Sequence, residues 1–121
     1  MKVYQLLNDN GNAWANQFVI TFDAYNIDIL RSYKSNVVLY DRNENHIALG
    51  DDWDYSKTTT RAVCKFLKDA TGTAWTKEEI KRAISDEYIT IYDRETGKAT
   101  GWSFATACDD FFEDFFREGE K

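Results

Sequence analysis

Several residue types are scarce in this chain of 121 residues, which contains no proline, one histidine and two cysteines. Average usage predicts about six prolines in this length, and no function follows from their absence. A single histidine excludes a histidine-rich metal site and leaves His46 as the only imidazole for a Ser-His-Asp or Cys-His-Asn arrangement. His46 falls on the returning strand of an expected hairpin, where a histidine most often packs across strands, so we expect no catalytic residue.

The two cysteines, Cys64 and Cys108, lie 44 residues apart with no second cysteine near either of them. This spacing excludes a zinc knuckle and a thioredoxin-like pair. We expect two reduced thiols that pack as small hydrophobic side chains, while a disulfide between them stays open. The phosphate-binding motifs G-x-G-x-x-G and G-x-x-x-x-G-K-S/T are also absent. Nucleotide hydrolysis is therefore not expected, and neither a cofactor nor a metal is predicted.

Long apolar runs are lacking as well, because no window approaches the 18 uninterrupted apolar residues of a membrane-spanning helix. The first residues, 1–7, give way to asparagine and aspartate before a signal-peptide core can form. Hydrophobic residues nevertheless make up 43% of the chain and aromatic residues 16%, which is too rich for a disordered chain. We therefore expect a soluble cytoplasmic protein, with one domain over residues 1–121 and no membrane partner.

The hydrophobic patterns predict strands in the N-terminal half and helices after them. Period-two alternation, with turn residues at the end of each run, favours an antiparallel meander, and a second hairpin follows the helices. The chain is thus predicted to be α+β, with an antiparallel sheet (meander plus C-terminal hairpin) and about three helices packed on one side. The expected strands are 2–7, 17–25, 32–41, 46–50, 87–93 and 99–104, and the expected helices are 57–71, 76–85 and 105–117.

The first two helices carry clear end signals. Ser56 is a favoured N-cap residue, and Gly72 is a favoured residue just past a helix C-terminus. Thr76 and Glu79 have the spacing of a capping box, in which each side chain satisfies the other residue's backbone N–H group. These signals predict where both helices start and where the first one ends.

One face of the first helix is apolar and the opposite face is basic. The basic face is a candidate nucleic-acid-binding site, with Trp53 and Tyr55 nearby in sequence for stacking on bases. Its alternative interpretation is an ordinary solvated helix face. The basic face consists of Lys57, Arg61, Lys65 and Lys68.

Acidic residues outnumber basic ones by 21 to 15, which gives a net charge of −6. This balance argues against a generic polyanion binder and allows a basic partner. Two acidic groups are candidates for a partner-binding surface, one just before the first helix and one within the acidic, Phe-rich C-terminal helix and tail at residues 105–121. The first group is Asp51, Asp52 and Asp54, and the second is Asp109, Asp110, Glu113 and Asp114.

Each acidic group also has a simpler interpretation. The first lacks the later ligands of a calcium-binding EF-hand loop, so it can be a solvated acidic turn. The second can be the wet face of an amphipathic helix whose phenylalanines seal the core. A ladder of carboxylates, however, imitates spaced phosphates and suits a positively charged nucleic-acid-binding groove on another protein.

The run Trp53-Asp54-Tyr55-Ser56-Lys57-Thr58-Thr59 follows a segment containing Ser32-Tyr33-Lys34-Ser35 and precedes Phe66-Leu67. In these features the chain, over about residues 1–95, resembles a family of small uncharacterised domains from phages and mobile elements of Gram-positive bacteria, with the signature W-D-Y-S-x-T-T. That family has no established activity. The resemblance implies a genomic setting in which many small acidic proteins inhibit host defence. By class analogy alone, the chain is similar to anti-CRISPR proteins.

Three functional hypotheses follow. The first is a non-enzymatic phage or mobile-element protein, monomeric or homodimeric, whose acidic surface binds a host protein with a basic nucleic-acid-binding groove. The sharpest form of this hypothesis is an anti-CRISPR protein that binds a CRISPR effector nuclease. The alternative is a small nucleic-acid-binding accessory protein that uses the basic face of the first helix. A third hypothesis, an enzyme or metal protein, would have to be built on His46, Cys64 and Cys108.

Overall fold

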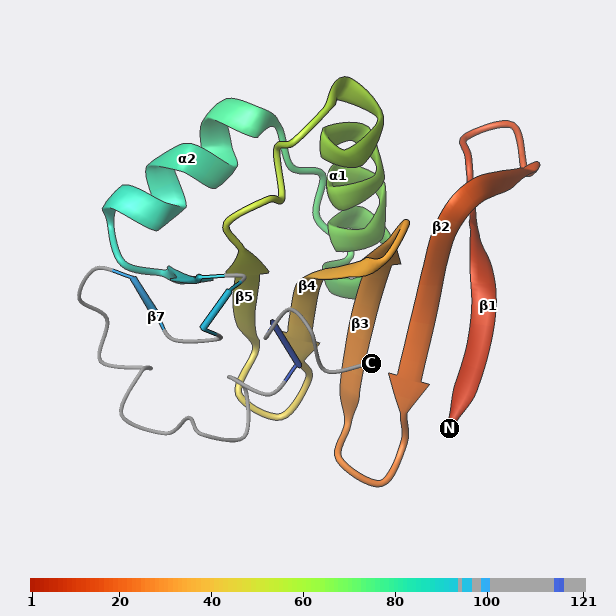
Figure 1. Cartoon of the computed structure of the whole chain (residues 1–121). Helices are drawn as coiled ribbons and strands as arrows, with labels where there is room; N and C mark the ends of the chain where they lie inside the picture. The colour runs from red at the N-terminus through yellow and green to blue at the C-terminus, as the bar shows by residue number, and fades with distance from the viewer. Residues whose placement is uncertain (94, 97–98, 101–114, 117–121) are drawn as a thin grey trace.

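The computed structural model of the chain describes residues 1–93, 95–96, 99–100 and 115–116. In these ranges, strands and helices follow one another in the order that Figure 1 shows. The elements are β1 (Lys2–Leu7), β2 (Ala13–Phe22), β3 (Ile27–Ser32), β4 (Ser35–Asp41), β5 (His46–Gly50), α1 (Lys57–Thr71), α2 (Lys77–Ser85), β6 (Ile89–Tyr92) and β7 (Ala99–Thr100). The α+β class predicted from the sequence is confirmed.

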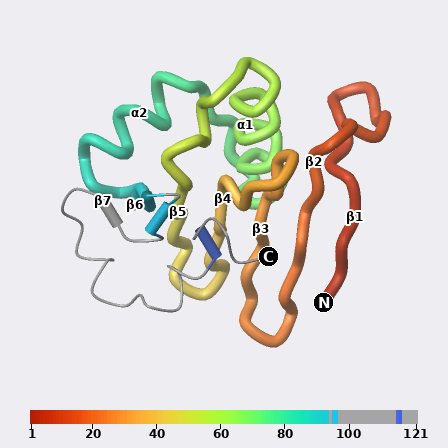
Figure 2. The backbone as a smooth tube through the Cα atoms, in the orientation of Figure 1, coloured from red at the N-terminus to blue at the C-terminus, as the bar shows by residue number. Residues whose placement is uncertain are grey.

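The strands join in one sheet, and their order in space follows their order along the chain (Figure 2). From β1 to β5 each strand runs antiparallel to the next, which confirms the N-terminal meander. β6 and β7 also pair antiparallel, but β5 and β6 are parallel. The prediction of an antiparallel sheet is wrong at that one junction. The connection through α1 and α2 is a crossover, which returns the chain to the end of the sheet where β5 begins.

β3 lies between two strands that the sequence predicts, 17–25 and 32–41, and was not itself predicted. In the structure β3 and β4 form a hairpin, and Ser32 pairs with Ser35 across the two-residue turn between them. Tyr33 in that turn has a left-handed φ of 58°, a conformation that asparagine or glycine usually marks. Every residue of β3 is buried or half-buried, so the strand lacks the alternation of apolar and polar residues on which the prediction relied.

The helix ends are confirmed where the cap residues predicted them. The Ser56 hydroxyl accepts a hydrogen bond from the backbone N–H of Thr59 at 3.1 Å, and Gly72 follows α1 with a left-handed φ of 78°. The Thr76 N–H donates to Glu79 Oε1 at 3.0 Å, and the Glu79 N–H donates to Thr76 Oγ1 at 3.1 Å. Both starts therefore depend on local sequence.

Both helices lie on the same face of the sheet (Figure 1), with α1 against β3 and β4 and α2 against β6. A core of apolar side chains fills the space between the two layers. In the described ranges, neither helix is long and apolar enough to cross a membrane. The core on this face includes Leu30, Val38, Leu49, Val63, Phe66, Leu67 and Ile80.

The opposite face of the sheet is also apolar, and Phe115 and Phe116 pack on it. The Phe116 ring stacks on Tyr92 with 5.0 Å between centroids, and the Phe115 ring meets Phe22 edge-on at 5.9 Å. The prediction that all helices pack on one side is corrected here, because α1 and α2 lie on one face while Phe115 and Phe116, which are helical, lie on the other. Since β3 is buried on both faces, both faces of the sheet need cover. The third predicted helix, 105–117, falls almost wholly outside the described residues.

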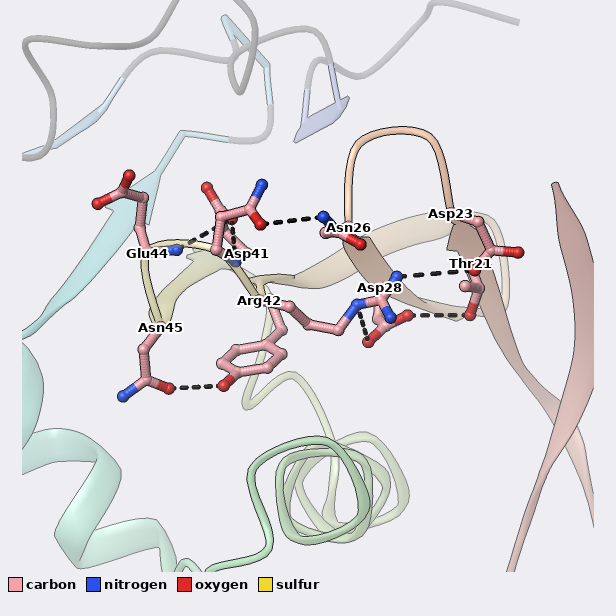
Figure 3. Close-up of polar contacts among 10 residues, drawn as sticks. Thr21, Asp23, Asn26, Asp28, Asp41, Arg42, Glu44 and Asn45 are labelled. Atoms are coloured by element: carbon pink, nitrogen blue, oxygen red, sulfur yellow. Dashed lines mark hydrogen bonds and ion pairs between the residues drawn. The ribbon is translucent and has the colours of Figure 1, made fainter.

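Polar side chains fasten two turns together at one end of the sheet (Figure 3). Arg42, in the turn after β4, lies 3.5 Å from the carboxylate of Asp28 and 3.8 Å from that of Asp23. The side-chain amide of Asn26 donates to Asn43 Oδ1 at 2.9 Å. These contacts hold the β2–β3 turn against the β4–β5 turn, at the end of the sheet opposite to the one where β5 leads toward α1.

Candidate functional site

The predicted acidic turn lies where β5 ends, and its three carboxylates share one hollow of about 480 Å³. Two further acids from the segment after β6 line the same hollow, together with one exposed tyrosine. We call this feature the acidic hollow. Its lining residues are Asp51, Asp52, Asp54, Tyr55, Asp93 and Glu95.

The parallel pairing of β5 and β6 brings these acids together, because the carboxyl ends of parallel strands meet at the same edge of a sheet. The Asp51 N–H donates to the Tyr92 carbonyl at 2.9 Å, which places Asp51 beside the end of β6. Asp93 Oδ1 accepts from the N–H groups of Glu95 at 2.8 Å and Thr96 at 3.1 Å. Asp93 and Glu95 are not among the acidic residues that the sequence predicts for this surface, because the local pattern does not indicate the parallel junction.

Gly50 allows close packing next to Asp52, one of the residues that line the acidic hollow. A Cβ atom on Gly50 would lie 2.9 Å from Asp52 Oδ1 and 3.3 Å from a ring carbon of Phe116. Any larger residue would therefore displace the Asp52 carboxylate or the Phe116 ring. Asp52 and Asp93 are half-buried, whereas Asp51, Asp54 and Glu95 are exposed, so three of the five carboxylates of the acidic hollow face solvent.

No group of three or more His, Cys, Asp or Glu side chains in the described part of the chain is arranged to hold a metal ion. The four predicted C-terminal acids, Asp109, Asp110, Glu113 and Asp114, lie outside the described residues, as does Cys108. The next residue along the chain is anchored, since the Phe115 carbonyl accepts from the side-chain amide of Asn36 at 2.9 Å.

The basic face of α1 borders a second hollow, of about 610 Å³. Arg61, Lys65 and Lys68 line it, whereas Lys57 does not. Lys65 forms an ion pair with Asp69 at 2.8 Å. We call this second feature the basic hollow, and three of the four predicted basic residues belong to it.

The structure places the two expected stacking residues elsewhere. Trp53 is only 5% exposed and belongs to the core, and Tyr55 lines the acidic hollow. Two other tryptophans, Trp14 on β2 and Trp75 between α1 and α2, line the basic hollow. No local spacing in the sequence indicates this pair, because tertiary packing alone brings the two residues to one place.

Cys64 also lines the basic hollow, with a free thiol. Burial raises the pKa of this thiol above its ordinary value, and the nearby carboxylates of Glu78 and Glu79 raise it further. The thiol therefore stays protonated at neutral pH and is a poor nucleophile.

His46 is the first residue of β5, and its Nε2 lies 3.1 Å from the hydroxyl of Thr90 on β6. Burial lowers the pKa of His46 below its ordinary value of 6.5, although the carboxylates of Asp41 and Glu44 act in the opposite direction. The folded protein therefore binds a proton at His46 less readily than the unfolded chain does.

A pH dependence of stability follows. As the pH falls through 6.5, the unfolded chain takes up a proton at this position before the folded protein does, so the free energy of unfolding should decrease. Urea unfolding of the protein and of His46→Gln at several pH values between about 7.5 and 5.5 measures the effect. An equal decrease in both proteins would contradict the assignment to His46.

Comparison with known proteins places the sequence in a family. A model described as "Family of unknown function (DUF8033)" matches residues 1–84. The chain belongs to this family. No curated protein and no solved structure matches it. The resemblance to an uncharacterised family is thus confirmed in this coarser form.

The segment that matches DUF8033 contains all of the basic hollow but only part of the acidic hollow. It covers β1 to β5, α1 and α2 up to Ile84. Every residue that lines the basic hollow falls within it, from Asn8 to Trp75. The acidic hollow takes Asp51, Asp52 and Asp54 from the matched segment but Asp93 and Glu95 from beyond it.

Proposed function

We propose that this DUF8033 member is a non-enzymatic protein of a phage or mobile element that inhibits a host defence nuclease. In its sharpest form the proposal is an anti-CRISPR function, in which an acidic surface binds the nucleic-acid-binding groove of a CRISPR effector nuclease. The acidic surface comprises the acidic hollow and the four acids at residues 109–114. The acidic hollow is the observation that carries the proposal.

Five carboxylates surround the acidic hollow, and none of its described lining residues is basic. Like charges gathered in this way repel one another, and a partner that brings cations relieves the repulsion. A groove that binds nucleic acid presents such cations along its length. Complementary potentials of this kind accelerate encounter and select the partner, so the acidic hollow favours a basic groove as its binding site.

Tyr55 adds an aromatic ring to the same surface, and the residue is 80% exposed. An arginine guanidinium stacks on such a ring while its N–H groups bond to neighbouring carboxylates. Tyrosine and arginine are also enriched among the residues that dominate binding energy at interfaces. The combination of Tyr55 with Asp54 and Asp51 supports a basic partner that is rich in arginine.

The test is binding of the tagged protein to purified CRISPR effector nucleases, with and without guide RNA, followed by a DNA-cleavage assay. We expect binding that weakens as salt rises, because exposed charges are screened, and we expect loss of cleavage in the complex. Failure to bind any effector, or binding that leaves cleavage intact, contradicts the anti-CRISPR function.

Charge reversal then locates the surface. One variant combines Asp54→Lys with Glu95→Lys, and a second reverses all four acids at residues 109–114. Each variant should weaken binding by about tenfold or more and restore cleavage. Glu44→Lys is the matched control, because Glu44 is exposed and lies at the opposite end of β5. Unchanged inhibition by both acidic variants would eliminate the acidic surface as the binding site.

A further inference from the structure

The basic hollow combines two features that nucleic-acid sites share, aromatic rings and cations. It lies between the turn after β1, the exposed side of α1 and the link from α1 to α2. These segments are distant in the sequence, so the hollow is a product of the fold. Its lining residues are Asn8, Asp9, Asn10, Trp14, Thr60, Arg61, Cys64, Lys65, Lys68, Ala74 and Trp75.

The two tryptophans are held in place and only half-buried. Both pack against the core on the helix face of the sheet. The Trp75 indole N–H also donates to Thr71 Oγ1 at 3.4 Å. Each ring is anchored on one side and borders the hollow on the other. Stacking of a base on such a ring therefore costs little side-chain conformational entropy. Stacking of this kind accepts any base, because every base has a π-face.

The cations lie along one side of the same hollow. Arg61, Lys65 and Lys68 are spaced four and three residues apart, so they share a face of α1 over about 10 Å of helix. Asp69 neutralises Lys65. Arg61 and Lys68 are exposed, and neither has an ion-pair partner among the described residues.

We propose that the basic hollow binds a short single-stranded segment of nucleic acid, with bases on Trp14 and Trp75 and phosphates on Arg61 and Lys68. A duplex does not fit this arrangement, because paired bases hide their faces within the stack. Asp9 lines the hollow as well, and the chain carries a net charge of −6, so binding is short-range and sensitive to salt. The proposal does not depend on the acidic surface.

Fluorescence anisotropy with labelled oligothymidylate and oligouridylate of about a dozen nucleotides tests the proposal. Both single strands should bind at low salt, and a duplex of the same length should bind at least about tenfold more weakly. With two or three phosphates neutralised, the logarithm of the binding constant should fall with the logarithm of salt concentration with a slope of about −1.4 to −2.1. Comparing the two oligonucleotides shows whether the site prefers DNA or RNA.

Two sets of variants assign binding to the basic hollow. Arg61→Glu with Lys68→Glu should weaken binding by about tenfold or more, whereas Lys57→Glu, on the same helix but outside the hollow, should change it less than about twofold. Trp75→Leu should weaken binding by about fivefold or more through loss of stacking, while Tyr55→Leu in the acidic hollow should not. Circular dichroism verifies that each variant is folded.

Three results of the oligonucleotide measurements would overturn the proposal, and a fourth comes from a peptide control. They are the absence of single-strand binding at low salt, equal affinity for the duplex, and an equal loss of binding in Lys57→Glu and in the Arg61 and Lys68 variant. Binding of an acidic peptide with higher affinity than either oligonucleotide would instead assign the basic hollow to a protein partner, and would equally overturn it.

Discussion

Phe116→Ala is expected to lower the free energy of unfolding by about 3–5 kcal/mol, the usual cost of truncating a buried phenylalanine. Phe116 is 3% exposed and belongs to the apolar cluster on the sheet face opposite the helices. Its ring stacks on Tyr92 at 5.0 Å with only 10° between the ring planes, and it lies against Gly50. Truncation therefore opens a cavity beside both β5 and β6.

Urea unfolding measures this decrease in the free energy of unfolding, and two further variants serve as comparisons. Phe115→Ala should cost less, because Phe115 is half-buried and meets Phe22 edge-on. Phe116→Leu should also cost less than Phe116→Ala, since it keeps most of the apolar volume. If Phe116→Ala matched the wild-type midpoint and slope, the far face of the sheet would be stable without this ring, and its assignment to the core would be wrong.

Gln17→Met is expected to change stability in the opposite direction, raising the free energy of unfolding by about 1–3 kcal/mol. The Gln17 side chain is 0% exposed, yet neither its Nε2 nor its Oε1 has a hydrogen-bond partner in the described part of the chain. Burying an amide in this way costs about 1–3 kcal/mol in proteins. Methionine has a similar length and flexibility without the polar atoms, so it removes the cost and fills the space.

Two other buried polar side chains, Ser32 and Thr59, lie close to Gln17. Gln17 pairs with Ser32 across β2 and β3, and the Ser32 hydroxyl lies 3.3 Å from that of Thr59 on α1. Gln5→Met is the matched control, because Gln5 on β1 is exposed and its replacement should stay within about 0.5 kcal/mol. A lower unfolding midpoint for Gln17→Met would show that the Gln17 amide is hydrogen-bonded in solution and stabilises the fold.

The sequence predicted those parts of the fold that depend on neighbouring residues. Ser56, Gly72, Thr76 and Glu79 gave the helix ends, because capping hydrogen bonds join residues two to four positions apart. Alternation gave most of the meander. β3 was missed because burial on both faces removes alternation, and because Tyr33 occupies a left-handed turn position without a glycine to mark it.

The candidate sites were less accessible to prediction than the fold. The acidic turn and the basic face of α1 are visible in the sequence as local patterns of charge. The sequence therefore predicted some of the residues that line each hollow. Asp93 and Glu95 joined the acidic hollow through the parallel pairing of β5 and β6. Trp14 and Trp75 joined the basic hollow through packing on a shared core. Both additions are contacts between residues that are distant in the chain.

The sequence by itself determined the α+β class, the helix ends and the two charged groups, because hydrogen bonds and side-chain periodicity act over a few residues. Only the tertiary structure decided which residues share a hollow and that Phe116 covers the far face of the sheet. The physical reason is that strand pairing and burial join distant segments. A periodic pattern tells which face of an element is apolar, but it does not tell which other element will cover that face.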